Sequence, residues 1–375
     1  MQDDRLADAV LTIDLDAIMA NWSMLRERAR PAECAAVVKA DAYGLGAERV
    51  APALAKAGCK SFYVAQLGEG IALRRALPEA AIYVTDGVLA GAEGELAAHR
   101  LVPVLNSLEQ LERWSGFARG GKRLETALHI DTGMNRLGLS ASDVERLAAE
   151  PGRLAGLALG LAITHLVSAE EQANPLNEEQ LARFQLLRAK LPPCRAGIAA
   201  SSGIFLGPRF HLDQVRPGAA LWGIAPQVSA PNPMRQVVEL HGQIVQVRDV
   251  DRGGTVGYGA THRLRRPSRI ATVGVGYADG YLRALANRGA GYLGDHAAPL
   301  VGRVSMDLVT LDATDVPAEL VHPGARVELL GPHRTADQMA ADAGTNGYEI
   351  LTNFGRSRRF QRRYRRAGDA GGDGR

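Results

Sequence analysis

The chain has 375 residues, of which 46% are hydrophobic and 23% charged, and this ordinary globular composition provides enough length for two domains. The formal net charge is +3, and seven arginines within residues 356–366 supply much of the basic character. No nucleic-acid-binding motif accompanies this run, so we interpret it as solvated surface and expect no nucleic-acid partner.

The cysteines and the hydropathy pattern restrict the class of protein further. Cys34, Cys59 and Cys194 have no paired spacing, which argues against a disulfide framework and against a metal site. The first residues lack the basic start and apolar stretch of a secretion signal, and no segment contains the run of about 20 apolar residues that a membrane span needs. We therefore expect a cytoplasmic protein that does not associate with membranes.

From about residue 35 to residue 222, short apolar runs alternate with longer amphipathic stretches such as residues 178–190. This alternation is typical of repeated βα units around a parallel sheet. Eight parallel strands indicate a TIM-like (β/α)8 barrel. The strands are predicted to begin near Ala35, Ser61, Ala81, Leu101, Thr126, Leu157, Arg195 and Gln214.

The pattern changes after a proline-rich break at residues 231–233. Beyond it apolar and polar residues alternate, as in residues 237–247, which favours β-structure, whereas residues 335–354 are predicted to be helical. We predict an α/β protein with a barrel domain over residues 1–233 and a mainly β domain over residues 234–366. The Gly- and Asp-rich residues 367–375 are predicted to be a disordered tail.

Lysine is rare in this sequence: only five of the 44 basic residues are lysines, at positions 39, 56, 60, 122 and 190. Lys39 ends an apolar run and precedes a glycine-rich turn at residues 44–46. Active sites of such barrels lie at the C-terminal ends of the strands. Because lysine can lose its proton and form a Schiff base, Lys39 is placed to bind pyridoxal phosphate covalently.

The segment around Lys39, VVKADAYGLG at residues 37–46, resembles the cofactor-lysine signature of the alanine racemases, and the resemblance extends from about residue 11 to residue 355. Each further segment is weak evidence alone, but the ordered set is specific. These segments are HIDTGMNRLG at 129–138, TH at 164–165, VRPG at 215–218, GYG at 257–259, GYADG at 276–280 and VSMD at 304–307. The resemblance implies a fold type III, pyridoxal-phosphate-dependent enzyme that interconverts L- and D-alanine.

Three of these segments end predicted barrel strands. Asp131 follows the strand that begins near Thr126, His165 follows the one that begins near Leu157, and Arg216 lies in the last strand. Their side chains are therefore expected to converge at one mouth of the barrel.

The resemblance implies a role for each cofactor contact. Arg216 donates to the pyridine nitrogen, where it cannot supply a proton, so the ring is a poor electron sink and side reactions are disfavoured. His165 lies beside the ring and supports Arg216. Tyr43, Ser202 and the backbone of Gly218 contact the phosphate, and the turn at Ser202 opens a helix-like segment suited to an anion.

The resemblance also implies how alanine is bound. Arg136 hydrogen-bonds the phenolic oxygen of the cofactor and orients the substrate carboxylate, which the N–H of Met306 also binds. Tyr277 narrows the entrance to small side chains.

Racemisation requires one base on each face of a planar intermediate. By resemblance, Lys39 takes the proton from D-alanine and Tyr258 takes it from L-alanine. The family also implies a head-to-tail homodimer, in which Tyr258 of one subunit completes the site of the other.

Two positions depart from the family pattern. Many relatives have a carbamate-modified lysine where this chain has His129, so the brace for Arg136 is unassigned. The C-terminal tyrosine that helps bind phosphate has no clear match, with Phe360 and Tyr364 as guesses.

Other functions remain open alternatives. A fold type III decarboxylase of basic amino acids presents a carboxylate to the pyridine nitrogen, which Arg216 argues against. A pyridoxal-phosphate homeostasis protein is a barrel that lacks the region of Tyr258 and Met306. The substrate range is a third alternative, because the enzyme could be a racemase of broader specificity that also accepts serine or longer side chains. The sequence also leaves the physiological role open, either supplying D-alanine for peptidoglycan or degrading alanine.

Overall fold

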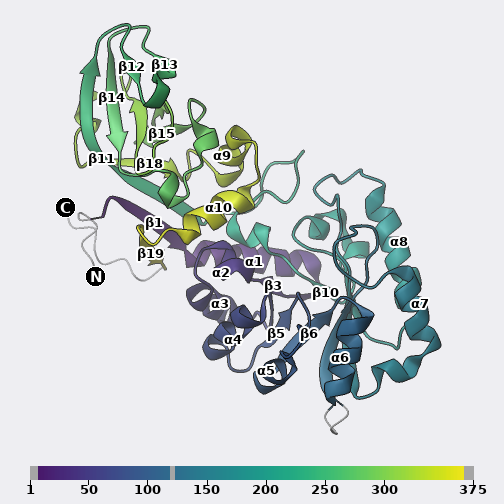
Figure 1. The fold of residues 1–375 in the computed structure, drawn as a ribbon. Helices are drawn as coiled ribbons and strands as arrows, with labels where there is room; N and C mark the ends of the chain where they lie inside the picture. Colours follow the sequence, from purple (N-terminus) through teal and green to yellow (C-terminus); the bar gives the residue numbers. More distant parts are fainter. Residues whose placement is uncertain (1–6, 119–122, 367–375) are drawn as a thin grey trace.

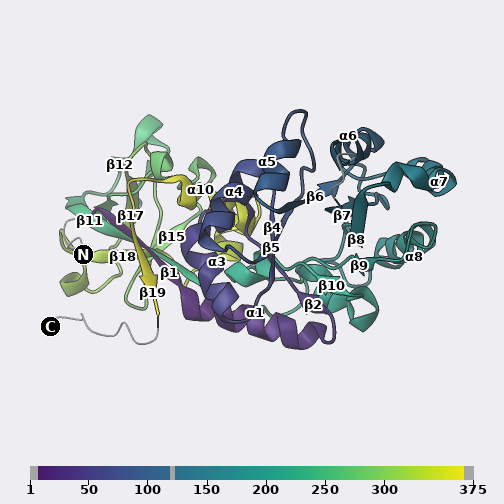
Figure 2. The ribbon, with the colours of Figure 1, turned by 90° about the horizontal axis from the view of Figure 1, so that it is seen from below.

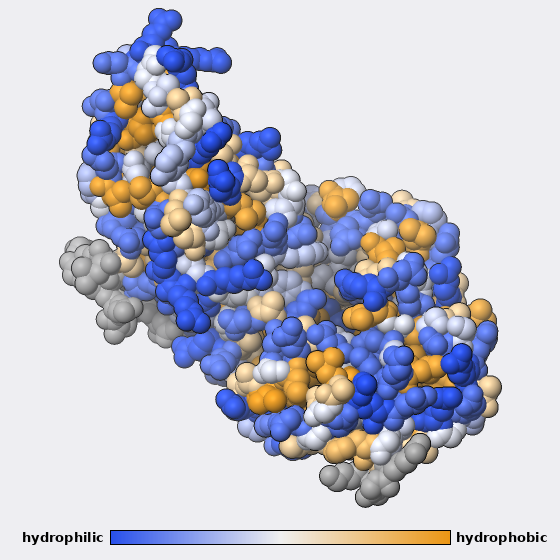
Figure 3. Space-filling model, viewed as in Figure 1, coloured by the Kyte–Doolittle hydropathy of each residue, from blue (hydrophilic) through white to orange (hydrophobic). Residues whose placement is uncertain are grey.

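The computed structural model describes residues 7–118 and 123–366 and shows two lobes, a barrel and a mainly β domain (Figures 1 and 3). On the face in Figure 3, hydrophobic patches are scattered over both lobes among mostly hydrophilic surface. The predicted tail at residues 367–375 lies outside the described residues. No helix in the described ranges has the length and apolar character needed to cross a membrane.

Short parallel strands build the sheet of the barrel, with β3 to β9 neighbouring one another in chain order. The strands are β2 (Glu33–Cys34), β3 (Ala36–Val37), β4 (Ser61–Val64), β5 (Ala81–Val84), β6 (Leu101–Leu105), β7 (Leu124–His129), β8 (Leu157–Ile163), β9 (Arg195–Gly197) and β10 (Gln214–Val215). The TIM-like barrel predicted from the sequence is confirmed, and the observed strands begin within two residues of the predicted positions.

Backbone hydrogen bonds around β10 close the barrel. β10 pairs in parallel with β2, and the amide of Ala35 donates to Val215 at 3.0 Å. On its other side, the amide of Arg216 donates to Ala199 at 2.9 Å. The predicted first strand is therefore divided into β2 and β3 at Ala35, and both halves take part in closure.

Side chains from alternate positions of the strands fill the barrel interior, because successive residues of a strand point to opposite faces. Buried members of this interior are Ala35, Tyr63, Val102, Val104, Ala127, Leu161 and Ile163. The other face of each strand packs against the surrounding helices in the larger core.

The helices of this domain follow the strands around the outside (Figures 1 and 2). The α-helices are α1 (Leu15–Ala29), α2 (Lys39–Tyr43), α3 (Ala47–Lys56), α4 (Leu67–Ala76), α5 (Glu93–Ala98), α6 (Leu108–Ala118), α7 (Ala141–Ala149) and α8 (Leu176–Arg188). Short 3-10 helices add η2 (Pro151–Leu154), η3 (Ser202–Leu206), η4 (Pro208–Phe210) and η5 (Ala219–Trp222).

The second domain is organised around an eight-stranded sheet in the described chain, in which β11 pairs with β1, β14 and β18. Its strands are β1 (Ala9–Asp14), β11 (Val238–Val250), β14 (Ser268–Val273), β15 (Ala290–Leu293), β16 (His296–Pro299), β17 (Val309–Asp312), β18 (Arg326–Leu330) and β19 (Gln361–Arg365), beside the small pair β12 (Thr255–Val256) and β13 (His262–Arg263). Its helices are α9 (Ala336–Ala343), α10 (Gly347–Arg356), η6 (Tyr258–Ala260), η7 (Tyr277–Asp279), η8 (Arg283–Leu285) and η9 (Ala318–Leu320).

Two details differ from the sequence-based expectation. Strand β1 falls in the range predicted for the barrel, but it pairs with β11 and β19 and so belongs to the sheet of the β domain (Figure 2). The single helical stretch predicted for residues 335–354 is two helices, because Gly344 ends α9 in the left-handed conformation and Asn346 caps α10.

Candidate active site

Lys39 begins α2, directly after the barrel strand β3, and its side chain is exposed at the C-terminal end of the strands. The next four residues, Ala40 to Tyr43, all have positive φ, between 53° and 57°. Residues with a Cβ pay about 1–2 kcal/mol each for this conformation and normally adopt it singly. A left-handed turn of four such residues needs support from the surrounding structure.

That support comes from α4 and α10. The carboxylate of Glu69, in the first turn of α4, accepts the Ala40 N–H at 2.6 Å and the Ala65 N–H at 2.8 Å. Gly44, which ends the turn, lies against Gly355 of α10 so closely that a Cβ built on Gly355 would be 2.1 Å from the Gly44 Cα. The conformation next to Lys39 is therefore held by a carboxylate and by contact between two glycines.

The alternation of side chains explains why polar groups collect at this end of the barrel. Val104 and Ala127 face the interior and are register partners, so Asn106 and His129, two residues further along, lie side by side above them. Ile163 faces the same interior, and His165 follows it by two residues. These residues form a polar layer on the apolar interior.

Arg216 is the most deeply buried charge of this layer, with 5% of its surface exposed. Its Nη2 donates to the carbonyl oxygen of Thr164 at 2.6 Å, and its Nη1 is buried without a partner in the described chain. No carboxylate of the described residues forms an ion pair with it, and burial lowers the pKa of its guanidinium. A buried cation without a counter-charge indicates a site that receives an acceptor or an anion from a ligand.

Both histidines of the layer are neutral near pH 7. Burial, and then the charge of Arg216, lower the pKa of His129 to about 4 and that of His165 to about 3. The ring of His129 is held by Asn106, whose Oδ1 lies 2.9 Å from Nδ1. Neutral imidazoles leave the positive charge of this region to Arg216, Arg136 and Lys39.

Arg136 lies on an exposed loop between β7 and α7, and no hydrogen bond or ion pair holds its guanidinium in the described chain. The carboxylate of Asp131 organises this loop, because its oxygens accept the N–H groups of Gly133, Met134 and Asn135 at 2.9–3.2 Å. The role of Asp131 is thus to shape the loop that carries Arg136.

Burial, and then the charge of Arg136, lower the pKa of the Lys39 ammonium, whereas Glu69 and Asp86 raise it. Although the Lys39 side chain reaches solvent at the mouth, surrounding protein removes part of its hydration. A lowered pKa favours the neutral amine, which is the nucleophilic form of a lysine.

The residues predicted to contact phosphate also lie together. A Cβ built on Gly218 would be 2.6 Å from the Tyr43 hydroxyl, so the two residues are in contact. The N–H of Gly218 donates to Ser201 Oγ at 3.0 Å, next to Ser202, which begins the short helix η3. The N–H of Gly218 thus already has an acceptor within the chain.

The structure identifies a C-terminal aromatic that the sequence-based interpretation missed. Tyr348 of α10 lies beside Tyr43, with ring centroids 6.3 Å apart. Of the two guesses, Phe360 packs against Phe354 in the core, and Tyr364 donates to the carbonyl of Leu45 at 3.0 Å. The signal that could have revealed Tyr348 is the pair Gly344 and Asn346, which ends one helix and caps the next and so places Tyr348 in the first turn of α10.

Three predicted residues, Tyr258, Tyr277 and Met306, lie on the β domain and are 70%, 41% and 55% exposed. Their loops are neighbours: the Tyr277 N–H donates to Ser305 at 3.0 Å, and a Cβ on Gly257 would lie 3.2 Å from the amide nitrogen of Arg303. The N–H of Met306 has no acceptor within the described residues.

This second group does not join the first within one chain. Tyr258 lies between β12 and β13, and these strands are at the end of the β domain away from the barrel in Figure 1. The chain therefore presents two half-sites, one at the barrel mouth and one on the β domain.

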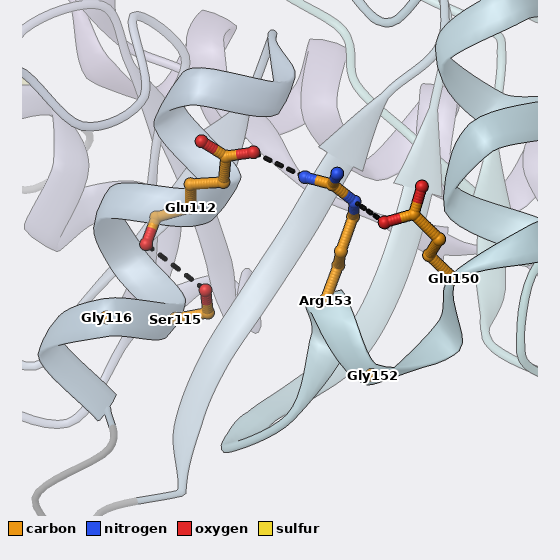
Figure 4. Close-up of a pocket in the computed structure, with 6 residues that line it drawn as sticks. All are labelled: Glu112, Ser115, Gly116, Glu150, Gly152 and Arg153. Atoms are coloured by element: carbon orange, nitrogen blue, oxygen red, sulfur yellow. Dashed lines mark hydrogen bonds and ion pairs between the residues drawn. The ribbon is translucent and has the colours of Figure 1, made fainter.

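A hollow lies at the opposite end of the barrel, and none of its lining residues belongs to either half-site. Figure 4 shows these lining residues. The hollow lies between α6 and η2, before β8 begins, and Arg153 forms ion pairs there with Glu112 and Glu150. Its lining residues are Glu112, Ser115, Gly116, Glu150, Gly152 and Arg153. Since barrel enzymes react at the other end, we do not assign chemistry to it.

Comparison with known proteins matches both domains. Residues 13–226 match the N-terminal domain of alanine racemases, and residues 237–364 match their C-terminal domain. The chain is 52% identical to the alanine racemase of Rhodospirillum rubrum over 96% of this chain and 97% of that protein. It is 47% identical to the alanine racemase of Brucella abortus, over 94% of each chain.

Solved structures agree with these sequence matches. The crystal structure of alanine racemase from Bartonella henselae with covalently bound pyridoxal phosphate superposes with a TM-score of 0.92, at 40% identity, over 96% of this chain and 99% of that one. With two domain matches that span most of the chain and close relatives along nearly its full length, the chain belongs to the alanine racemase family.

Proposed function

We propose that this protein is a pyridoxal-phosphate-dependent alanine racemase that interconverts L- and D-alanine. One observation carries the proposal: a buried, carboxylate-free Arg216 shares the barrel mouth with a lysine whose pKa is lowered. Family membership adds to this site-based argument, because the relatives at 47–52% identity are named for that activity.

The residues at the mouth fit the cofactor. Nη1 of Arg216 lacks an acceptor, which the pyridine nitrogen of the cofactor could supply. Tyr43, Ser202 and Gly218 lie together, where they could contact the phosphate of a cofactor held by Lys39. Tyr348 is a further candidate for the phosphate, because it lies beside Tyr43. Bound to Lys39, pyridoxal phosphate would supply the electron-withdrawing ring that acidifies the α-proton of an amino acid.

The protein's own residues then move the proton. We assign Lys39 as the base for D-alanine and Tyr258 as the base for L-alanine. The exposure of Tyr258 and its distance from the barrel in the fold support a homodimer in which Tyr258 serves the partner's site. Arg303, beside Gly259, brings a positive charge to the loop that carries Tyr258.

Substrate recognition is assigned to Arg136, to the N–H of Met306 and to Tyr277. Both donors are without an acceptor in the described chain, so a carboxylate can satisfy them. Tyr277 is 41% exposed next to Met306, where a ring limits the size of the side chain that can enter.

A panel of L- and D-amino acids, analysed by chiral chromatography after incubation with the holoenzyme, tests the proposal. We expect alanine to racemise in both directions and to reach equal amounts of its enantiomers. Comparable rates with serine or longer side chains would favour a broad-specificity racemase. Release of carbon dioxide from lysine or arginine, without racemisation of alanine, would favour a decarboxylase.

A further inference from the structure

Gln180 lies on the buried face of α8, the helix that follows β8, and 3% of its surface is exposed. Its side-chain amide bonds three groups that lie beyond the ends of β7 and β8. Nε2 donates to the hydroxyl of Thr132 and to the carbonyl oxygen of His165, both at 3.0 Å. Oε1 accepts the N–H of Val167 at 2.9 Å. Both ends of this buried amide therefore have partners within the protein.

The amide of Gln180 has one orientation that suits these partners. The carbonyl of His165 can only accept a hydrogen bond, and the N–H of Val167 can only donate one. Turning the amide over would place oxygen against oxygen at His165 and N–H against N–H at Val167, so both groups would lose their partner. Residues 164–167 lie outside helices and strands. Gln180 therefore holds this irregular segment in one conformation.

The same network holds the residue that directs Arg216. Thr164 precedes His165, and its carbonyl oxygen accepts the hydrogen bond from Nη2 of Arg216 at 2.6 Å. The hydroxyl of Thr164 lies 2.8 Å from that of Thr132, and both threonines are 1% exposed. Gln180 thus holds Thr164 from two sides, through the backbone of His165 and through the pair of hydroxyls.

The direction of the Thr164 carbonyl matters because it is the hydrogen-bond acceptor that the described residues offer to Arg216. The guanidinium is planar, so a fixed Nη2 also fixes the place of Nη1, the buried donor without a partner. A shift of the carbonyl would move this donor away from the pyridine nitrogen to which we assign it. A misplacement of about 1 Å can cost about a hundredfold in rate.

We propose that Gln180 is a positioning residue that sets the direction of Arg216 toward the pyridine nitrogen of the cofactor, acting through Thr164. This role rests on the proposed function. Because the amide of Gln180 is engaged by protein groups at both ends, it acts on the cofactor only through them. A helix on the outside of the barrel thereby contributes to the geometry at the mouth.

A double-mutant cycle on cofactor binding tests this role. Apoenzyme is titrated with pyridoxal phosphate and followed by absorbance for the wild type, Gln180→Leu, Arg216→Gln and the double variant. We expect Gln180→Leu to raise the dissociation constant about tenfold in the wild-type background, and less than about twofold where Arg216 is already replaced. Equal effects in the two backgrounds would show that Gln180 acts independently of Arg216 and would overturn the proposal.

Gln185→Leu is the matched control, because it makes the same replacement on the exposed face of the same helix. It should leave the dissociation constant within about twofold of the wild type. If Gln180→Leu does not fold, Gln180→Met, which is unbranched and similar in length, takes its place in the cycle. The titration needs no turnover, so it separates the two proposals. Coupling in a protein that does not racemise alanine would count against the proposed function alone, and additive effects in an active racemase would count against the role of Gln180 alone.

Discussion

The guanidinium of Arg216 donates to the carbonyl of Thr164 at 2.6 Å through one nitrogen, while the other terminal nitrogen is buried without a partner. The backbone of the strand end thus fixes the direction of the arginine and leaves a donor unsatisfied. This relationship makes Arg216 the most informative residue for testing how the protein controls the cofactor ring as an electron sink.

Replacing Arg216 by Glu should slow racemisation by about a hundredfold or more, because a carboxylate favours a protonated pyridine nitrogen and alters the electron sink. During turnover, absorbance should build up at a longer wavelength than that of the resting enzyme. Arg216→Gln is the control: it removes the cation without favouring protonation, so it should slow the reaction without the new band. A glutamate variant with unchanged spectrum and rate would remove Arg216 from the site.

The yellow holoenzyme should carry its cofactor on Lys39. Reduction with borohydride followed by peptide mapping should find the label on the peptide of residue 39, and Lys39→Ala should show none. Label on Lys56, Lys60, Lys122 or Lys190 would falsify the assignment.

The two half-sites predict complementation between inactive subunits. Lys39→Ala and Tyr258→Phe proteins are mixed under conditions that exchange subunits, confirmed with a mass tag. If Tyr258 acts in trans, each heterodimer contains one site with both lesions and one with none, so activity should return. A mixture that stays inactive despite exchange would exclude the shared-site arrangement and leave the Lys39 assignment intact.

The contact between Gly44 and Gly355 predicts a sensitive position far along the chain from Lys39. Gly355→Ala should destabilise the protein by about 1–3 kcal/mol and weaken cofactor retention, because its Cβ would overlap the turn after Lys39. Gly116→Ala in α6 is the matched control, since its Cβ meets nothing within 4 Å and alanine favours a helix. Equal melting temperatures and cofactor content in the two variants would show that α10 does not hold the turn.

Acid should destabilise the fold through its two neutral histidines. The folded pKa values of about 4 for His129 and about 3 for His165 lie below the ordinary value of about 6.5. As pH falls below 6.5, the unfolded chain binds protons that the folded chain does not, so stability is lost until about pH 4 and pH 3, respectively. At pH 5 we expect a loss of about 1–2 kcal/mol per histidine relative to pH 7.

Urea denaturation of the holoenzyme between pH 7 and pH 4 measures this loss. His129→Gln should flatten the dependence of unfolding free energy on pH, whereas His296→Gln, a replacement on the exposed surface, serves as the control. A slope that His129→Gln leaves unchanged would mean that this ring is protonated equally in both states.

The sequence by itself determined the barrel strands and the neighbourhood of Lys39. Strands such as β4, β6 and β8 are short apolar runs that must be buried, and the amphipathic stretches between the strands have helical periodicity, so local pattern and burial agree. Asp131, His165 and Arg216 were expected to converge because parallel strands share one C-terminal edge. His165 and Arg216 lie there, together with His129, whereas the carboxylate of Asp131 instead accepts the N–H groups of its own loop.

Only the tertiary structure decided the features that depend on contacts between segments far apart in the sequence. β1 joins the C-terminal sheet because its backbone finds register with β11 and β19, which no local pattern reveals. The left-handed turn at residues 40–43 contains no glycine, and it exists because Glu69 and Gly355 support it from elsewhere. In the same way Tyr348 meets Tyr43, and Asn106 fixes the ring of His129, through the packing of elements separated along the chain.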